Sequence, residues 1–581
     1  MKRIAYIYII LAALLVSGCE DFLSFDPLTQ KTSANYPANA EEAKQMIAGI
    51  YTTMNNEHQV ADGSYLFANI VASDEILGGG GVNDIKPQAF EAFMYSDLDM
   101  LGHNWETTYE GIHRANYAIE NLPEMDEAVL TAAMRNQYLG EAYFLRAFFY
   151  HRLATLYGSV PLKITTEVVD LPGASAEEIF AQIASDLKMA IEIMPETPYT
   201  DIEQGHATRW AAQAMMARVW LFYTGFYQNT DLPLVEGGSV SKQNVIDYLT
   251  DCVGHSGHKL VGDFHELWPY TNSLTIGDYD YIQDYMADTG KKLVYASDNG
   301  ARNPETMFAL QFNNFANWDI RRGYSNTYQL YFALRGLQSV DKTFPFAGGW
   351  GQANSIPKQW VDQWMVDEPN DPRIGASVMD IAAELPNYAV GQWDFVLESN
   401  YWGKKYNGIS AKNPETGEAV HDYSVLMYGN QNNNQLSHGD DLVFIRFADV
   451  LLMLSELTGD AQYMNEVRDR ADLPPVTYSL ENLQKERRHE LAFEGLRYND
   501  MRRWGATYTK AALETQVGTP VLNFGKPAVF NGLNPKGYSA RYDETKGFFP
   551  IPQSQIDLSK GLLEQVEGYR NGEGLYSGWS N

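Results

Sequence analysis

Two segments in the middle of the chain combine tryptophan with planar polar side chains. The first holds Trp318, Arg321 and Tyr324, and the second holds Trp350 and Gln352. Sugars present apolar C–H faces and polar rims, so proteins commonly hold them with a flat aromatic ring and with amide or guanidinium hydrogen bonds. These residue types therefore predict a carbohydrate-binding surface. The alternative for any one of these tryptophans is packing in the core.

Trp350 is the strongest candidate in these two segments. It lies between Gly349 and Gly351, so little neighbouring bulk prevents its ring from projecting out of a loop. Trp402 and Tyr406 form a third candidate pair further along the chain. We expect Trp350 to be the central platform of the site.

A glycine-rich stretch at residues 74–84 is a further candidate. Its sequence, DEILGGGGVND, ends in Asn83 and Asp84. Consecutive glycines permit backbone conformations that are closed to other residues and a close approach of a ligand. A phosphate loop is disfavoured because no Gly-Lys-Ser/Thr follows and the flanks are acidic. An exposed turn, a ligand-contacting loop and a calcium site remain as interpretations.

One group of residues has metal-like spacing. One thiol and three imidazoles could hold zinc geometrically. The alternative is that the histidines of this loop are solvated or cap a helix. The four residues are Cys252, His255, His258 and His265.

No pattern in the chain indicates catalysis. His489 and Glu490 begin an HExxH sequence, but Phe493 occupies the position of the second histidine. There is no GxSxG sequence and no persuasive pairing of cysteine with histidine. The adjacent Asp440 and Asp441 do not indicate a glycosidase in so acidic a chain, because the separation of two carboxylates in space decides that mechanism. We assign no catalytic residue, no metal and no cofactor.

These candidates depend on helices for their placement, and the strongest helical pattern covers residues 484–505. The sequence QKERRHELAFEGLRYNDMRRWG contains no proline and is rich in helix-forming residues. Glu486, Glu490 and Glu494 fall in one i,i+4 row, with arginines within i+3 or i+4 reach of acidic neighbours. We predict one continuous helix that ends at Gly505 and carries a buried, paired charge network.

The same segment closely resembles the C-terminal signature of the SusD/RagB family, the nutrient-binding lipoproteins of Bacteroidetes-type outer membranes. Other blocks resemble that family in the family's own order along most of the chain. They are WETTY at 105–109, RAN at 114–116, GEAYFLR at 140–146, LYGSVPL at 156–162, FIR at 444–446, ADVLL at 448–452, NEVR at 465–468 and FPIP at 549–552. The resemblance implies degenerate tetratricopeptide-like repeats. It also implies a SusC-like TonB-dependent outer-membrane transporter as partner.

The N-terminus predicts export and lipidation. A basic start at Lys2 and Arg3 precedes an apolar run over residues 4–16 that is too short to span a bilayer. The sequence VSGC at 16–19 resembles a lipobox, in which Cys19 becomes the lipidated first residue. An ordinary secretory peptide with an incidental cysteine is the alternative. If Cys19 is acylated, Cys252 is the only other cysteine and no intrachain disulfide forms.

The mature chain is strongly acidic. Removal of residues 1–18 leaves 41 basic and 74 acidic residues, which gives a net charge of −33. Such a surface argues against binding to nucleic acid and against adhesion to anionic lipid.

The chain divides into regions of different character. Residues 1–18 are interpreted as a signal peptide, 19–40 as a tether and 41–581 as a single domain. Within that domain we expect a helical scaffold at 41–227, a loop-rich aromatic ligand-binding face at 228–440, a helical return at 441–505 and C-terminal loops at 506–581. The fold is thus predicted to be mainly α, with stacked helix pairs. The helices are expected at 41–57, 103–122, 134–157, 176–194, 206–227, 444–457, 461–471 and 480–504.

The best functional interpretation is a surface-exposed, lipid-anchored outer-membrane protein. It would capture an oligosaccharide without turnover and deliver it to the transporter. The alternatives are a peptide-binding RagB-like member of the same family and a surface glycan hydrolase. Peptide capture would depend more on backbone hydrogen bonds along an extended groove.

Overall fold

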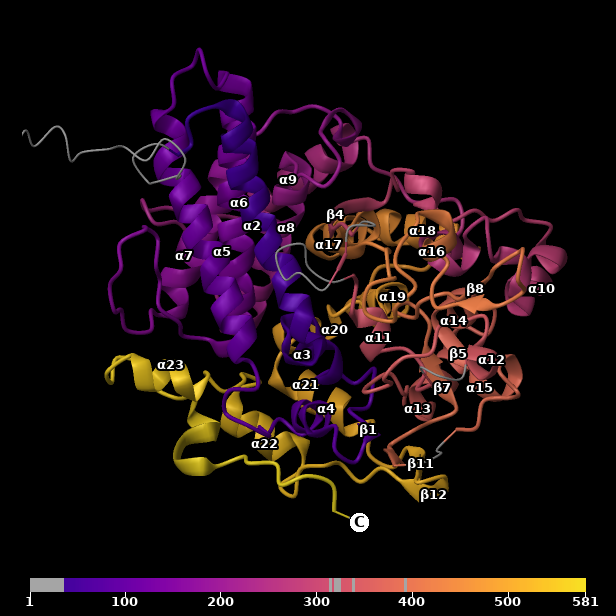
Figure 1. Ribbon diagram of the computed structural model, residues 1–581. Helices are drawn as coiled ribbons and strands as arrows, with labels where there is room; N and C mark the ends of the chain where they lie inside the picture. The colour runs from indigo at the N-terminus through magenta and orange to yellow at the C-terminus, as the bar shows by residue number, and fades with distance from the viewer. Residues whose placement is uncertain (1–35, 313–315, 318–324, 337–339, 391–393, 581) are drawn as a thin grey trace, which may run out of the picture.

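A computed structural model describes residues 36–312, 316–317, 325–336, 340–390 and 394–580. Its N-terminal part is a layer of long helices that run side by side (Figure 1). Consecutive members of this layer pack against each other, and α2 lies against α5. Its helices are α2 (Ala40–Glu57), α5 (Gly102–Asn121), α6 (Ala132–Tyr157), α7 (Ala176–Ile193), α8 (Arg209–Tyr227) and α9 (Lys242–His255). The short α3 (Tyr65–Val71) and α4 (Ile85–Glu91) lie between α2 and α5 in sequence.

Side-chain caps fix where the helices of this layer begin. The Thr131 hydroxyl accepts a hydrogen bond from the Met134 amide at the start of α6, and Thr208 does the same for Ala211 at the start of α8. Ser175 and Glu178 form a reciprocal capping box on α7. Such caps satisfy amide groups that have no partner within the helix. The helix predicted at 206–227 therefore begins three residues later, after its Thr208 cap.

Helix α6 is the centre of the layer. It contacts α5 on one side and α7 on the other, and nearly all of its residues from Tyr138 onward are buried. This agrees with the apolar character of the sequence around most of its circumference. The prediction of a mainly α fold with tetratricopeptide-like helix pairs is confirmed.

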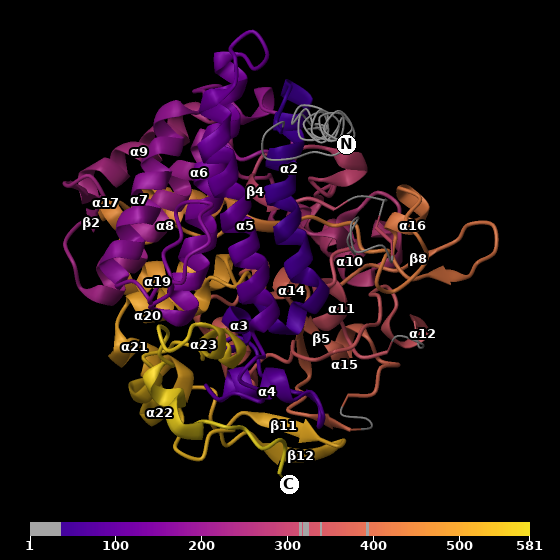
Figure 2. The same ribbon diagram turned by 60° about the vertical axis from the view of Figure 1, so that its left-hand side comes forward.

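The middle of the chain lies beside the helical layer and is built from short elements joined by loops (Figures 1 and 2). It has a smaller aromatic core of its own, which includes Phe346 and Trp402. Its helices are α10 (Asp280–Thr289), α11 (Tyr328–Tyr331), α12 (Val340–Thr343), α13 (Lys358–Asp367), α14 (Arg373–Ser377), α15 (Ile381–Glu384) and α16 (Ser424–Met427).

The strands are short and pair two by two in the described part of the chain, always antiparallel. The pairs join distant segments as well as neighbouring ones. They are β1 (Gly80–Gly81) with β6 (Phe395–Val396), β2 (Leu232–Pro233) with β3 (Ser239–Val240), β4 (Thr306–Leu310) with β10 (Leu442–Arg446), β5 (Val378–Asp380) with β7 (Tyr401–Gly403), β8 (Ala411–Lys412) with β9 (Ala419–Val420), and β11 (Pro520–Asn523) with β12 (Lys526–Val529).

Helices return after β10, as α17 (Phe447–Thr458), α18 (Ala461–Arg470), α19 (Leu480–Glu490) and α20 (Arg497–Arg503). The helix predicted at 444–457 begins later than expected because residues 444–446 belong to β10. The single helix predicted at 480–504 is also wrong. It breaks between α19 and α20, where Phe493 and Gly495 adopt positive φ angles of +64° and +74°.

The tail was expected to consist of loops, but it contains α21 (Ala506–Glu514), α22 (Tyr538–Thr545), α23 (Gln553–Leu558) and the β11–β12 hairpin. It crosses the lower ends of the long helices in Figure 1. No helix among the described residues is long and apolar enough to cross a membrane. The segment that holds Cys19 lies outside the described residues, so the division into signal peptide, tether and domain stays a prediction.

Candidate functional site

The glycine-rich loop packs closely against two distant segments and is not an exposed turn. Gly80 and Gly81 form β1, which pairs with Val396 and Phe395 of β6. A Cβ atom added at Gly79 would lie 2.4 Å from the Val396 carbonyl oxygen, and one added at Gly80 would lie 2.8 Å from the Gln352 carbonyl oxygen. Gly80 also has a φ of +83°. The glycines are therefore required for contact with the segment that carries Gln352.

Asp84 fixes the end of this loop. One of its carboxylate oxygens accepts a hydrogen bond from the Gly81 amide at 2.7 Å. Burial raises the pKa of Asp84, although the Gly81 amide and the Arg335 guanidinium oppose the rise. Asn83 is exposed beside it. The loop thus presents Asp84 at a fixed place next to Arg335.

Trp350 is held by backbone hydrogen bonds to α11. Its amide donates to the Leu330 carbonyl at 2.8 Å, and the Gln352 amide donates to the Tyr331 carbonyl at 2.9 Å. The Trp350 and Tyr331 rings meet edge to face, with centroids 4.7 Å apart and planes at 79°. Trp350 remains partly exposed. An indole that is braced by a second ring can offer a rigid face to a ligand.

Arg335 joins the loop to the Trp350 segment. Its guanidinium lies 3.2 Å from a carboxylate oxygen of Asp394 and 3.7 Å from one of Asp84. It also lies over the Phe395 ring, 4.7 Å from the centroid. These side chains are partly exposed, so they can exchange hydrogen bonds with a ligand. We call the group formed by Asp84, Tyr331, Arg335, Trp350, Gln352 and Asp394 the Trp350 site.

Gln352, two residues after Trp350, is partly exposed. Its side-chain oxygen is buried and has no hydrogen-bond partner among the described residues. A buried polar atom without a partner is costly in free energy unless water or a ligand satisfies it. This oxygen is enclosed, so Gln352 would offer it to a bound molecule only after its side chain turned outward.

Two other predicted site residues lie elsewhere. Trp402 is wrong as a surface platform, because it is 1% exposed and its indole N–H donates to the Phe332 carbonyl at 2.8 Å. The Tyr406 ring packs against Tyr328 and Phe332, with centroids 6.4 and 5.8 Å apart, at the edge of the main core. The interior of the protein therefore encloses the Trp402 ring, whereas Tyr406 is partly buried and packs against the core.

Trp318, Arg321 and Tyr324 lie outside the described residues. Among the other tryptophans of the middle region that the structure describes, Trp360 and Trp364 are buried, and Trp268 lies under the Lys405 ammonium at 4.8 Å. Among the described tryptophans of this region, Trp350 is therefore the partly exposed one whose ring no cation covers.

The residues with metal-like spacing do not gather. Cys252 is buried in α9, and His255 pairs with Asp251 on the surface. His258 stacks on Tyr199, and His265 lies between Asp263 and Tyr281. In the described ranges no cluster of three or more His, Cys, Asp or Glu residues could hold a metal ion.

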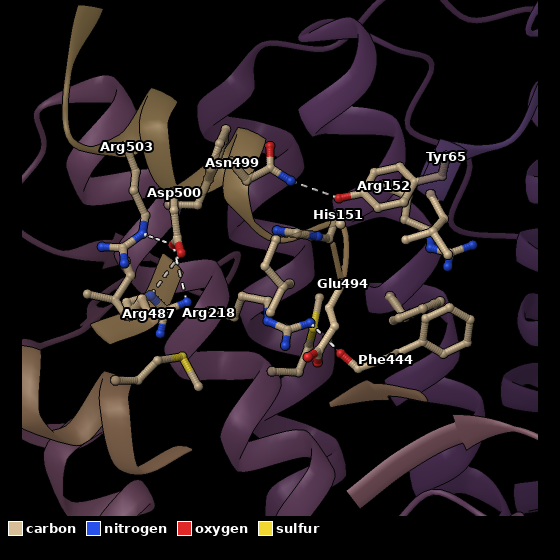
Figure 3. A pocket seen from close by; sticks show the side chains of 18 residues that line it. Tyr65, His151, Arg152, Arg218, Phe444, Arg487, Glu494, Asn499, Asp500 and Arg503 are labelled. Atoms are coloured by element: carbon tan, nitrogen blue, oxygen red, sulfur yellow. Dashed lines mark hydrogen bonds and ion pairs between the residues drawn. The ribbon is translucent and has the colours of Figure 1, made fainter. Parts of the chain in front are cut away.

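A small internal cavity lies between α6, α8 and α20 and is lined by ion pairs (Figure 3). Asp500 accepts hydrogen bonds from Arg487 and Arg503, each at 2.8 Å. The cavity volume is about 60 Å³. Ligand pockets commonly occupy about 300–1,000 Å³, so this cavity is a feature of the packed core and not a sugar site.

A groove of about 490 Å³ lies between α5, the loop at 161–171 and α23. Its tryptophan, Trp105, is only 4% exposed, whereas Val168 and Leu558 on its lining are 95% and 69% exposed. It therefore lacks an exposed indole platform. None of the candidate ligand-binding residues line it.

The comparisons with known proteins agree with this architecture. A model of the SusD family matches residues 292–569, and a model described as starch-binding, associating with the outer membrane, matches residues 27–221. The chain belongs to the SusD family.

Individual relatives are distant but cover most of the chain. SusD-like protein P25 of Formosa agariphila is 23% identical across 98% of this chain and 99% of its own. Surface glycan-binding protein A of Bacteroides fluxus has a TM-score of 0.68 at 22% identity, over 91% of this chain and 99% of its own. The protein of that name from Bacteroides thetaiotaomicron, solved in complex with laminarihexaose, has a TM-score of 0.66 at 17% identity over the same shares.

Sequence reasoning missed three members of the site. Tyr331, Arg335 and Asp394 carry no local motif, and only the pairing of 330–336 with 349–352 and of β1 with β6 brings them together. The charged residues are spread over three segments of the chain. No spacing along the sequence could have revealed them.

Proposed function

We propose that the protein binds an oligosaccharide at the Trp350 site without chemical turnover. The observation that carries the proposal is the partly exposed Trp350 ring, braced edge to face by Tyr331 beside a guanidinium that two carboxylates flank. A flat ring removes the C–H face of a sugar from water, which is favourable by about 25 cal/mol per Å² of apolar area.

The polar members of the site match the rim of a sugar. Arg335 can donate hydrogen bonds to a sugar, whereas the partly exposed carboxylates of Asp84 and Asp394 can accept them. Each sugar hydroxyl both donates and accepts, so mixed partners around one ring suit it. The partly exposed ion pairs can rearrange toward a ligand at modest free-energy cost.

Family membership supports the choice of ligand. One matching family model is described as starch-binding, and one structural neighbour was solved with laminarihexaose. We infer that this chain likewise takes a glycan, while its loop residues set which glycan it takes.

The proposal extends to location and partner. Cys19 would carry the lipid that anchors the protein to the outer membrane, with the folded part at the cell surface. A SusC-like TonB-dependent transporter would receive the captured oligosaccharide. The lipobox sequence and the family supply the support for both statements.

The test is a glycan array followed by titration calorimetry on the soluble fragment 20–581. Binding of one oligosaccharide class, with no release of reducing ends during prolonged incubation, is the expected result. Release of reducing ends would support the hydrolase, and binding of peptides in place of glycans would support the RagB-like alternative.

A further inference from the structure

The turn of the β11–β12 hairpin has a residue that its backbone does not favour. Asn523 pairs with Lys526, so Phe524 and Gly525 form a two-residue connection. Both turn residues have positive φ angles, +52° for Phe524 and +71° for Gly525. Turns of this type strongly prefer Asn-Gly, because a bulky side chain is strained in the left-handed region. Phenylalanine at this position therefore costs free energy of folding.

The Phe524 ring contributes little to the stability of the fold. The side chain is 37% exposed and belongs to none of the hydrophobic core clusters of the described residues. Many aromatic side chains in the described part of the chain stack on one another, but the Phe524 ring makes no such contact there. A strained residue that is also exposed and apolar points to a role outside folding.

Backbone hydrogen bonds fix this turn next to the Trp350 site. The Phe524 amide donates to the Phe395 carbonyl at 2.7 Å, and the Leu397 amide donates to the Asn523 side-chain oxygen at 2.8 Å. Phe395 follows Asp394, whose carboxylate pairs with Arg335. Figure 1 shows β1 and the hairpin close together at the lower edge of the molecule.

We propose that Phe524 is a second aromatic platform, which contacts sugar units of the same oligosaccharide beyond those held at Trp350. This inference rests on the proposed function of the Trp350 site. A ligand of several sugar units would cross from the Trp350 ring, over Arg335 and Asp394, to the Phe524 ring. A mono- or disaccharide would occupy only the Trp350 end.

The unfavourable backbone conformation of Phe524 makes it possible to distinguish a ligand-binding role from a structural one. In the variant Phe524→Asn, asparagine suits the turn and keeps the amide that bonds to Phe395, but it removes the ring. If Phe524 stabilised the fold, its replacement by asparagine would destabilise the hairpin. If Phe524 served ligand binding instead, the replacement would leave the hairpin equally or more stable.

The experiment compares the wild-type protein with Phe524→Asn and with the control Val529→Asn, which changes a 54% exposed side chain on the same hairpin. Affinities for laminaribiose and laminarihexaose are measured by calorimetry, and melting temperatures by circular dichroism. We expect Phe524→Asn to weaken laminarihexaose binding by at least about fivefold, with laminaribiose binding and the melting temperature not reduced. We expect the control to match the wild type in binding.

Three results would overturn the inference. Equal laminarihexaose affinity in Phe524→Asn would contradict this inference alone. A clear fall in its melting temperature would return Phe524 to a structural role. A wild-type protein that does not bind laminarihexaose would overturn the inference as stated, and one that binds no glycan on the array would contradict the proposed function as well.

Discussion

Arg446 and Glu494 form a two-point ion pair inside the protein. The Arg446 Nε atom lies 2.8 Å from one carboxylate oxygen of Glu494, and a terminal nitrogen lies 3.0 Å from the other. The Lys405 ammonium donates to the same carboxylate at 2.8 Å. Burial alone would raise the pKa of Glu494, but Arg446 and Lys405 outweigh it and hold the pKa below its ordinary value. The predicted buried charge network is thus confirmed at this residue.

Substitution Glu494→Ala should lower stability strongly. It leaves Arg446 and Lys405 with less compensation in a buried site, and breaking such a pair costs about 3–5 kcal/mol. Urea unfolding followed by circular dichroism measures the change. The control Glu481→Ala removes a 77% exposed carboxylate from the same segment and should have little effect. Equal stability of both variants would show that the Glu494 pair is not a stabilising contact.

This network also explains why the helix prediction failed. Helix propensity favours continuity through residues 491–496, yet the Phe493 amide donates to the buried Glu75 carboxylate at 3.0 Å, and Glu494 lies between Arg446 and Lys405. Those partners come from distant segments, so no local pattern could reveal them. The local signal of the break is the glycine at position 495. In the structure, a Cβ atom added to Gly495 would lie 2.3 Å from a side-chain atom of Leu66.

Glu91 should make stability depend on pH. It is 1% exposed, accepts a hydrogen bond from the Gly78 amide at 3.0 Å and binds the Tyr538 hydroxyl. Burial raises the pKa of Glu91 to about 8. Between the pKa of Glu91 in the unfolded chain and about 8, the folded state binds one more proton at Glu91 than the unfolded state does. The contribution of Glu91 to the free energy of unfolding therefore falls as pH rises, by at most about 1.4 kcal/mol per pH unit.

The variant Glu91→Gln cannot titrate and should show a shallower decline in unfolding free energy between about pH 5 and pH 8. Urea titrations at several pH values measure the slope. The exposed Glu415→Gln serves as the control and should keep the wild-type slope. Parallel curves for wild type and Glu91→Gln would refute the role assigned to this carboxyl.

Charge at the Trp350 site should favour neutral sugars. Asp394 and Asp84 already flank Arg335, so a uronate would meet two carboxylates with one guanidinium. The variant Asp394→Asn should improve binding of a uronate-bearing oligosaccharide relative to its neutral counterpart by roughly fivefold, the effect of one charge at about 4 Å in water. Calorimetry at low and high salt checks this, because salt should reduce the gain. The same charge change in Asp288→Asn, at an exposed position, should leave the ratio of uronate to neutral-sugar affinity unaltered. An unchanged ratio in Asp394→Asn would show that the charge of Asp394 does not act on the ligand.

Cys19→Ala should release the protein from the outer membrane. The motive is the short apolar run that ends at VSGC, although Cys19 lies outside the described residues. Cell fractionation and the mass of the mature N-terminus are the measurements. Cys252→Ala is the matched control, because that thiol is buried in α9 and cannot carry an anchor. Full membrane retention of Cys19→Ala, together with a wild-type mature N-terminus that carries no acyl mass, would rule out lipidation at Cys19.

The sequence predicted the helical layer well and the site only in part. Long helices such as α6 follow from local periodicity and caps, which neighbouring residues determine. Trp350 and Trp402 both lie in the loop-rich middle of the sequence, yet Trp350 is partly exposed, whereas Trp402 is buried and donates a hydrogen bond to the Phe332 carbonyl. That difference depends on which strands and loops pair across the fold. Phe524 likewise follows from the fold, because the pairing of β11 with β12 places it in a turn that its residue type does not favour.

The affinity of Trp350→Ala for the glycan that the wild type binds tests the role of the Trp350 site. We predict a loss of at least about tenfold, or ~1.4 kcal/mol, with an unchanged melting temperature, because a central platform carries a large share of the binding free energy. Trp402→Ala is the matched control and should lose several degrees of melting temperature, because its ring fills the core. Native-like affinity of Trp350→Ala, or a collapse of its melting temperature, would contradict the role of Trp350 as a binding platform.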